Sequence, residues 1–399
     1  MMRYHRWMMR VKTGLERLVE EPHLIGGRPW ALLANQAAVT PGLVPARQAL
    51  LAAGVGPLRR LLAPEHGLDG VAQDMEAVSD ETDPLTGAPV RSLYGSTEAT
   101  LTPSPEDLEG VEVLIVDLPD IGARHYTFAA TMDLAMGAAA AAGIEVIVLD
   151  RPNPITGRFR EGGLVHRGFN SFVSHLDIPV RHGLTLGELA LWCRRRRHPN
   201  LQLTVLSCQG WKRNRWWQET GLPWVPPSPN MPRLETALLY PGLCLVEATT
   251  LSEGRGTTTP FHLVGAPGID PFDLCAALRR LDLPGFGFRA ARFRPEFSKH
   301  AGKVCGGVQI QILAPEVVRP VTAAVLLLAT VRECAPDAFG WREQPYEFVA
   351  AVPAIDLLTG SAAVREALET GGLLEPVFAA WSEEVAAFER SLEDLLLYR

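Results

Sequence analysis

Short runs of consecutive apolar residues alternate with helical patterns over roughly the first 150 residues of the chain. The apolar runs cover residues 30–34, 61–63, 111–116 and 144–149, and the helical patterns cover residues 11–20, 46–53 and 127–142. Buried strands that alternate with helices are typical of a parallel sheet with helices on both faces. The pattern therefore predicts an α/β fold with a Rossmann-like, doubly wound parallel sheet.

The next part of the chain continues this alternation. Thr185 followed three residues later by Glu188 forms a capping box, so we expect Glu188 to cap a helix over residues 186–193. Short strands are expected over residues 178–183 and 203–206. These elements extend the predicted sheet and its helical cover.

The pattern changes near residue 265. From there a helix over 272–281, strands over 286–293 and 306–313 and a helix over 318–334 are expected. A chain of 399 residues is too long for one ordinary core. We therefore predict two domains, a Rossmann-like domain over residues 1–264 and a smaller α+β domain over residues 265–399.

Each apolar run of the predicted sheet ends in polar side chains. They are Asn35 after the first run, Glu65 and His66 after the second, Asp117, Asp120 and Arg124 after the third, and Asp150, Arg151 and Asn153 after the fourth. One such cluster alone is as consistent with helix capping as with function. Parallel strands, however, end at one edge of the sheet, where open α/β sheets bind ligands. Together the clusters predict one shared hollow.

The segment from Leu61 to Gly70 is the most informative of these strand ends. The apolar run stops at Pro64 and is followed at once by Glu65 and His66. A carboxyl group beside apolar neighbours is suited to act as a general acid. The alternative is a strand-to-helix loop in which Glu65 and His66 only cap or face solvent.

Three further segments have unusual composition. Residues 72–90 form a long polar loop, which suggests a functional lid. Arg255 lies between two glycines in residues 252–259, an arrangement suited to binding a carboxylate. Four tryptophans between residues 211 and 224 precede the proline-rich loop 226–232. These aromatic side chains either stack on sugar rings in a cleft or are ordinarily buried.

Composition limits the classes of function. The net charge of −7 argues against general binding of nucleic acid, which needs a cationic surface. The N-terminus has no apolar stretch long enough for a signal peptide, and no window approaches 18 uncharged apolar residues. Six scattered cysteines without a C-x-x-C pair are typical of free thiols in a reducing compartment. We expect a cytoplasmic protein without a membrane span.

Several common motifs are absent from the sequence. It contains no P-loop, no G-x-G-x-x-G after the first strand, no G-x-S-x-G and no H-E-x-x-H. His66, His125 and His182 together with Asp117 and Asp120 match no standard spacing of metal ligands. We therefore expect neither a metal nor a cofactor.

Beyond these patterns, a series of short motifs resembles one bacterial family over residues 12–399. In chain order the motifs are PEHGLDG (64–70), SLYG (92–95), DLPDIGARHYTF (117–128), LDRPNPITG (149–157), EGG (161–163), SFVS and IPVRHGLTLGELA (171–190), GW (210–211), PSPNMP (227–232), YPG (240–242) and SEGRGTTTPF (252–261). The family was long known only as a domain of unknown function. It is now associated with exo-acting β-N-acetylmuramidases of the NamZ type, glycoside hydrolase family 171.

The resemblance implies hydrolysis of β-linked N-acetylmuramic acid from the non-reducing end of peptidoglycan fragments. It implies a catalytic Rossmann-like domain, a smaller domain that completes the cleft, and frequent export of family members. Two glutamates, Glu65 and Glu161, match the catalytic pair. With Glu65 as the general acid, the other positions are expected to bind the carbohydrate: Asn35, His66, Asp120, Arg124, Tyr126, Arg151, Asn153, His182, Asn230, Glu253 and Arg255.

Within this set, Arg151 or Arg255 would bind the lactyl carboxylate that distinguishes muramic acid from glucosamine, a task suited to a guanidinium. Retaining, inverting and substrate-assisted routes all stay open. Carboxyl groups about 5–5.5 Å apart favour retention, and a separation of about 6.5–9.5 Å favours inversion.

Two other functions remain as alternatives. The strand-end carboxylates and arginines would also suit a metal-dependent hydrolase of a phosphorylated sugar or a nucleotide. The tryptophans and arginines would suit a non-catalytic protein that binds muropeptides. Loss of activity on chelation would favour the first, and binding without turnover would favour the second.

Overall fold

The structure, a computed structural model, describes residues 10–399. Residues 1–9, in which part of the search for an export signal falls, lie outside the described residues. Within residues 10–399, no helix is both long and apolar enough to cross a membrane. The cytoplasmic location stays a prediction.

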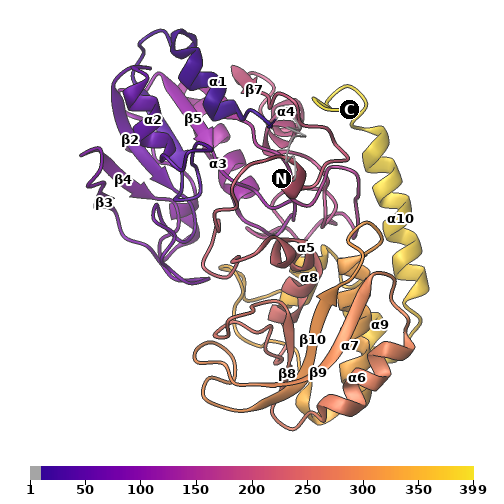
Figure 1. Cartoon of the computed structure of the whole chain (residues 1–399). Coiled ribbons are helices and arrows are strands. Elements are labelled where there is room, and N and C mark those ends of the chain that lie inside the picture. Colours follow the sequence, from indigo (N-terminus) through magenta and orange to yellow (C-terminus); the bar gives the residue numbers. More distant parts are fainter. Residues whose placement is uncertain (1–9) are drawn as a thin grey trace, which may run out of the picture.

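The larger of two sheets has seven strands and forms the first part of the molecule (Figure 1). Its strands are β1 (Trp30–Ala34), β2 (Leu58–Ala63), β3 (Glu81–Thr82), β4 (Pro89–Ser92), β5 (Val113–Asp117), β6 (Glu145–Leu149) and β7 (Leu203–Leu206). They lie in the order β3-β4-β2-β1-β5-β6-β7, and every pair except β3 with β4 is parallel. The predicted parallel sheet is confirmed.

Helices cover both faces of this sheet. They are α1 (Gly14–Glu20) and α2 (Ala46–Ala52) on one face, and α3 (Phe128–Ala142) and α4 (Leu186–Arg196) on the other. Because successive side chains of a strand point to opposite faces, Trp30 and Leu32 pack with α1 and α2, whereas Ala31 and Leu33 pack with α3. The apolar runs are continuous because both faces are buried, which confirms the doubly wound arrangement.

Two expectations about local structure were inaccurate. The segment 72–90 is not loop throughout, because β3 and the start of β4 lie within it and extend the sheet beyond β2. Residues 178–183 do not form a strand. Arg181 makes only isolated bridges to Ala123 and Glu161, since its segment crosses the strand ends instead of joining the sheet. The predicted capping box at Thr185 and Glu188 is confirmed.

The second part of the chain is α+β, as predicted. Its elements are α5 (Leu234–Leu243), β8 (Leu263–Ala266), α6 (Pro271–Arg280), β9 (Phe286–Phe293), β10 (Cys305–Ile312), α7 (Pro320–Cys334), α8 (Ala354–Thr359), α9 (Ala363–Thr370) and α10 (Glu375–Arg390). The three strands form an antiparallel sheet in the order β8-β10-β9. Helices α5 and α7 approach closely at Gly242, where a Cβ atom would lie 1.8 Å from the Pro320 carbonyl oxygen. The domain boundary near residue 265 stays a prediction.

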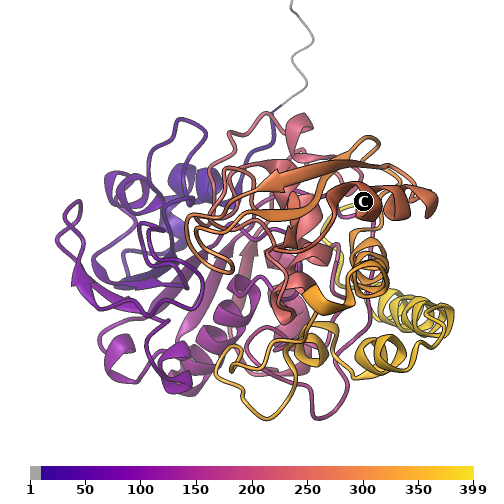
Figure 2. The ribbon, with the colours of Figure 1, turned by 90° about the horizontal axis from the view of Figure 1, so that it is seen from below.

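The two parts pack against each other and share one hydrophobic cluster (Figures 1 and 2). Helix α10 runs back from the small domain, so the C-terminus lies beside the α/β domain (Figure 1). There the Tyr398 hydroxyl accepts a hydrogen bond from the Cys208 N–H and donates one to Asp150 at the end of β6. Residues of the second part are thereby held near the strand ends.

Candidate active site

A tight turn after β2 presents Glu65. The Gly67 N–H donates to the Pro64 carbonyl at 3.0 Å, and His66 adopts a positive φ of 72°. Positive φ is uncommon for a residue with a side chain, so the turn is held by its surroundings. The His66 Nδ1 atom lies 2.9 Å from the Ala72 carbonyl oxygen, which ties the turn to the following loop.

Both carboxylate oxygens of Glu65 have partners. Thr127, at the N-terminus of α3, donates its hydroxyl to Oε2 at 2.7 Å, and the Met75 N–H lies 3.3 Å from Oε1. Glu65 is buried. Two donors on one carboxyl group are an arrangement suited to a carboxylate anion, which accepts hydrogen bonds only.

Glu65 opens into a hollow of about 450 Å³, its mouth included, between the two parts of the molecule. We call it the carboxyl pocket. Its lining residues are Glu65, His66, Asp74, His125, Tyr126, Thr127, Val173, Ser228, Asn230, Met231, Tyr240, Glu247, Arg255, Phe261, Tyr346 and Glu347. Most of this volume is its open mouth, and the enclosed part, about 30 Å³, has room for about two water molecules in the empty protein, so a sugar ring enters only as the walls move apart.

A second glutamate, Glu347, lines the same pocket from the second part of the chain. Glu347 and Phe348 both have positive φ, 46° and 67°, a strained backbone of the kind that clusters at functional sites. The Tyr94 hydroxyl donates to Glu347 Oε2 at 2.9 Å. Burial, and then the charge of Glu65, raise the pKa of Glu347 well above its ordinary value. Because like charges disfavour each other's ionisation, the neighbouring charge of Glu65 favours the protonated form of Glu347.

Arg255 is the cation of the carboxyl pocket. Its Nε lies 3.0 Å from Asp74 Oδ1, its Nη1 donates to Glu247, and Glu253 lies 3.8 Å away. Burial opposes the charge of Arg255, but Glu247 and Asp74 outweigh it and raise the pKa of the guanidinium. Asp74 belongs to the loop after β2, so this ion pair connects the predicted lid to the second part of the chain.

The structure brings five of the predicted site residues together in the carboxyl pocket: Glu65, His66, Tyr126, Asn230 and Arg255. Asn230 donates to Gln73 Oε1 at 2.9 Å, so the proline-rich loop 226–232 contacts the lid loop. The Tyr126 ring meets Tyr240 edge-on, with centroids 5.8 Å apart. The lid loop, the proline-rich loop and the strand end therefore surround one space.

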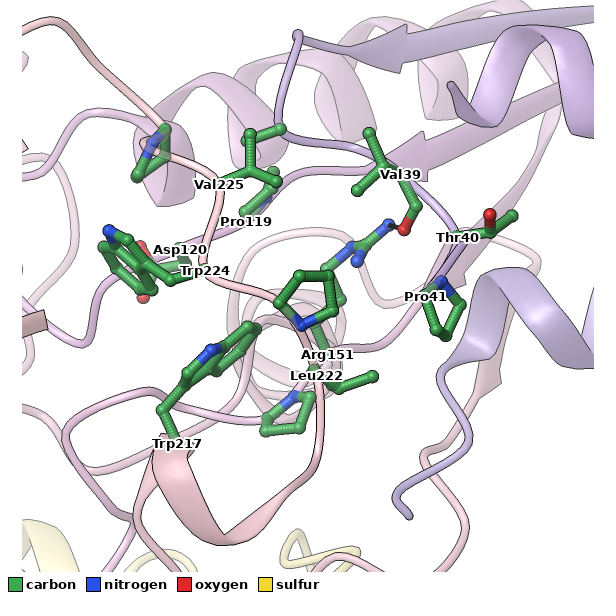
Figure 3. A pocket seen from close by; sticks show the side chains of 14 residues that line it. Val39, Thr40, Pro41, Pro119, Asp120, Arg151, Trp217, Leu222, Trp224 and Val225 are labelled. Atoms are coloured by element: carbon green, nitrogen blue, oxygen red, sulfur yellow. Dashed lines mark hydrogen bonds between the residues drawn. The ribbon is translucent and has the colours of Figure 1, made fainter. Parts of the chain in front are cut away.

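Asp120 and Arg151 line a different hollow, so the prediction of one shared hollow is wrong. We call this second hollow the indole pocket (Figure 3). Its lining residues are Ala37, Val39, Thr40, Pro41, Pro119, Asp120, Arg151, Pro152, Trp217, Leu222, Pro223, Trp224, Val225 and Pro227. Consecutive residues of loop 226–232 line the two hollows, Pro227 the indole pocket and Ser228 the carboxyl pocket.

Three other predicted residues bond to the backbone instead of lining either pocket. Asn35 donates to the Pro227 carbonyl at 2.9 Å, and Asn153 donates to the Leu184 carbonyl at 2.9 Å. Arg124 donates to three carbonyl groups, those of Gly163, Ile178 and Leu358. Burial lowers the pKa of Arg124 to about 10. These side chains hold the loops around the site in place.

His182 is also buried among internal partners. Its Nδ1 accepts from the Leu184 N–H at 3.1 Å, so the proton of the neutral ring lies on Nε2, which faces Asp120 Oδ2 at 3.4 Å. Glu253 pairs with Lys299 at 2.9 Å. Burial alone would raise the pKa of Glu253, but Lys299 and Arg255 lower it.

Glu161 does not line the carboxyl pocket. Its Oε1 accepts from the Thr322 N–H at 2.7 Å at the start of α7, and its backbone pairs with that of Arg181. Burial raises the pKa of Glu161. The structure therefore does not bring Glu161 together with Glu65.

Sequence reasoning missed several lining residues, above all Asp74, Thr127, Glu247, Tyr346 and Glu347. Asp74 lies in the segment predicted to be a lid. Glu347 lies in a segment without regular secondary structure and does not follow an apolar run. A search for polar residues at the ends of predicted strands therefore does not find it. Across residues 10–399, no group of three or more His, Cys, Asp and Glu side chains is arranged to hold a metal ion.

Comparisons with known proteins agree on one family. The model of the N-terminal domain of exo-β-N-acetylmuramidase NamZ matches residues 30–235, and that of its C-terminal domain matches residues 238–398. The chain is 37% identical over 390 residues to the peptidoglycan β-N-acetylmuramidase NamZ of Bacillus subtilis, covering 98% of this chain and 92% of that protein.

Two solved structures of DUF1343-family proteins from Bacteroides fragilis are also similar. One is 34% identical with a TM-score of 0.89 and covers 98% of this chain and 100% of its own. The other is 28% identical with a TM-score of 0.75 and covers 98% and 99%. The similarity in both sequence and structure therefore spans both parts of the molecule.

Proposed function

This chain belongs to the NamZ family of exo-β-N-acetylmuramidases, which are glycoside hydrolases, and we propose that it releases N-acetylmuramic acid from the non-reducing end of peptidoglycan fragments. One observation supports this most: Glu65 and a second buried carboxyl group, Glu347, line the same pocket. Two carboxyl groups at one site are what hydrolysis of a glycosidic bond requires.

Glu347 is the general acid in this proposal, and Glu65 is the carboxylate that faces the anomeric carbon. The sequence alone favours Glu65 as the acid. The contacts favour the reverse, because Glu65 accepts two hydrogen bonds while burial and the charge of Glu65 raise the pKa of Glu347. An acid must hold its proton at the working pH.

The reaction then follows from these two protonation states. Glu347 gives its proton to the glycosidic oxygen as the bond to the anomeric carbon breaks, and the negative charge of Glu65 stabilises the positive charge that develops on the sugar. Water completes the hydrolysis, and its proton restores the acid form of Glu347. Glu161, which bonds to the start of α7, acts in this scheme only by positioning the second part of the chain.

Arg255 binds the lactyl carboxylate of the substrate in this proposal. Arg151 is less suited, because its Nε and Nη2 atoms already form a paired contact with Asp117, at 2.6 and 2.8 Å. Asp74 is partly exposed on the lid loop, and its carboxylate occupies the Nε side of Arg255 in the empty pocket. The lactyl carboxylate would replace Asp74 there, which couples substrate recognition to movement of the lid.

The direct test compares 4-nitrophenyl β-N-acetylmuramide with the matching N-acetylglucosaminide. We expect release of 4-nitrophenol from the first and at least about 100-fold less from the second, since the site would lose one paired charge contact. The variant Arg255→Lys should narrow this ratio, because lysine cannot form a two-point contact with a carboxylate. Equal rates on both glycosides would contradict the proposal.

A chelator distinguishes this proposal from the main alternative, a metal-dependent phosphohydrolase. Hydrolysis through two carboxyl groups should be unaffected by EDTA, whereas a phosphohydrolase that needs Mg²⁺ should stop. Binding of the muramide without any turnover would instead support a non-catalytic binding protein.

A further inference from the structure

The indole pocket lies at the point where the strand order of the large sheet reverses. From β1 the chain builds outward to β2 and β4, and it then returns to β5 on the other side of β1 and continues to β6 and β7. The loops that follow β1, β5 and β6 supply Val39, Asp120 and Arg151 to this pocket. In open α/β sheets such a switch point, at the carboxyl ends of the strands, is the usual place for a ligand.

Two tryptophans form the outer wall of the indole pocket. Trp217 belongs to the short 3-10 helix Trp217–Glu219, and Trp224 to the segment that follows it. Their rings meet edge-to-face, with centroids 5.6 Å apart and planes at 87° (Figure 3). The pocket encloses about 470 Å³, its mouth included. Only about 30 Å³ of it is enclosed in the empty protein, room for about two water molecules, so a sugar ring enters only as the walls move apart.

Three polar atoms at this pocket are buried without a hydrogen-bond partner. They are the indole Nε1 atoms of Trp217 and Trp224 and the Oδ1 atom of Asp120. The Asp120 side chain is only 6% exposed, and its other oxygen accepts from the Gly122 N–H at 2.7 Å. Buried polar groups are normally paired, so these three atoms around one pocket are a set of donors and an acceptor that a polar ligand can satisfy.

The chemistry of the wall defines the ligand. The charge of Arg151 is neutralised by Asp117, so the pocket offers no free cation for a phosphate or a carboxylate. Asp120 accepts from a hydroxyl or an amide N–H, the indole N–H groups donate to a hydroxyl or an acetyl oxygen, and the ring faces pack against C–H groups. A neutral N-acetylated hexosamine carries all of these features.

We propose that the indole pocket is a second saccharide subsite, which binds the neutral N-acetylated sugar next to the cleaved bond. This inference rests on the proposed hydrolysis in the carboxyl pocket. The two pockets share a wall, because consecutive residues Pro227 and Ser228 line one each, and Asn35 holds the Pro227 carbonyl. Recognition of two adjacent sugars would make a disaccharide end a better substrate than a single glycoside.

The charges of Asp120 and Glu65 both act on Tyr126, which lines the carboxyl pocket. Burial raises the pKa of Tyr126, and the charges of Asp120 and Glu65 add to that effect.

The unpaired indole and carboxylate atoms are shielded from solvent in the empty protein. The sugar must therefore part the rings of Trp217 and Trp224 to reach them.

Kinetics with two substrates test the subsite. Trp224→Ala should raise the KM for the disaccharide of N-acetylmuramic acid and N-acetylglucosamine at least about tenfold more than the KM for 4-nitrophenyl β-N-acetylmuramide. The reason is that only the disaccharide carries the second sugar that packs against this ring. The control is Trp341→Ala, because Trp341 lines neither pocket and bonds to Glu369. Equal changes in both KM values would overturn the subsite.

A binding measurement separates failure of the subsite from failure of the proposed hydrolysis. Saturation-transfer NMR with free N-acetylglucosamine should give a signal with the wild type and Trp341→Ala, and a much weaker signal with Trp224→Ala. Asp120→Asn, which replaces a single atom, should also weaken the signal and serves if the tryptophan variant does not fold. No signal with the wild type overturns the subsite, while absence of turnover on either glycoside overturns only the proposed function.

Discussion

Glu65 and Glu161 look alike in the sequence, and the structure places them in different surroundings. Both are buried, and both were predicted to be catalytic. Glu65 receives its hydrogen bonds from the Thr127 hydroxyl at the start of α3 and from the Met75 N–H of the lid loop, and it opens into a pocket that holds another carboxyl group. Glu161 receives its bond from the backbone at the start of α7 and lies outside that pocket.

The difference shows that burial of a carboxyl group does not identify a catalytic residue. Glu161 gives one oxygen to a fixed backbone donor at a helix start, where several N–H groups need such a partner, while its Oε2 atom is buried without a hydrogen-bond partner. A glutamate beside an empty space and a second acid has an electrostatic environment that a substrate can change. The following variants test this contrast, from the largest expected effect to the smallest.

Glu65→Gln should lower kcat by about 10³-fold or more on both good and poor leaving groups, because the carboxylate that stabilises the developing charge is lost. Release of 4-nitrophenol measures the rate, and thermal unfolding controls for folding. A variant that keeps more than a tenth of the wild-type rate would remove Glu65 from the reaction.

Glu347→Gln should lower kcat by about 10²-fold on a substrate with a poor leaving group and much less on the 4-nitrophenyl glycoside, which needs little protonation. The acid works only when protonated, so the wild-type rate should fall as the pH rises through the raised pKa of Glu347. This decrease of the rate at alkaline pH should disappear in the variant. If the variant keeps the same decrease of the rate at alkaline pH, another residue is the general acid.

Asp74→Asn should lower the KM for the N-acetylmuramide about threefold, because a partly exposed ion pair with Arg255 is worth at most about 1 kcal/mol. The KM for the N-acetylglucosaminide, which has no lactyl carboxylate, serves as the control. A raised KM for the muramide would show that Asp74 binds the substrate and does not compete with it.

Glu161→Gln should leave kcat within about twofold of the wild type, because the amide oxygen still accepts from Thr322 and no contact with the sugar is lost. Its measurable effect is on stability. Burial raises the pKa of Glu161 above its ordinary value of 4.5, so the neutral form is favoured in the folded protein. The contribution of this group to stability is therefore full below that value and is lost as the pH rises.

Glutamine is always neutral, so the free energy of unfolding of Glu161→Gln should increase relative to the wild type as the pH rises from 4 to neutrality. Urea unfolding at several pH values measures this difference. A large loss of kcat in a folded Glu161→Gln protein would contradict the contrast between the two glutamates.

Much of the fold was predictable because local patterns report it directly. Continuous apolar runs identified the buried parallel strands, and the Thr185–Glu188 pair identified a helix start. Strand β4, which lies between β2 and the edge strand β3, was missed because it is short and partly exposed, so it carries no continuous apolar run. Residues 178–183 were misread because an apolar segment that crosses strand ends has the same local composition as a strand.

The candidate site was only half predictable. Glu65 and Arg255 were found because a proline-terminated strand and flanking glycines mark them in the sequence. Glu347 was missed because its partner Tyr94 is 253 positions away, and its own segment has no periodic pattern. The division of the strand ends between two pockets depends on where loop 226–232 passes, which no local pattern reports.

By itself, the amino-acid sequence determined the parallel sheet, the side chains at its edge and the family. The reason is that hydrophobic periodicity, helix-capping residues and short motifs are properties of neighbouring residues. Only the tertiary structure decided which of those side chains share a pocket, which acid keeps its proton and which polar atoms lack a partner. The physical reason is that burial, hydrogen bonding and charge–charge effects depend on distance in space, and residues far apart in the chain set that distance.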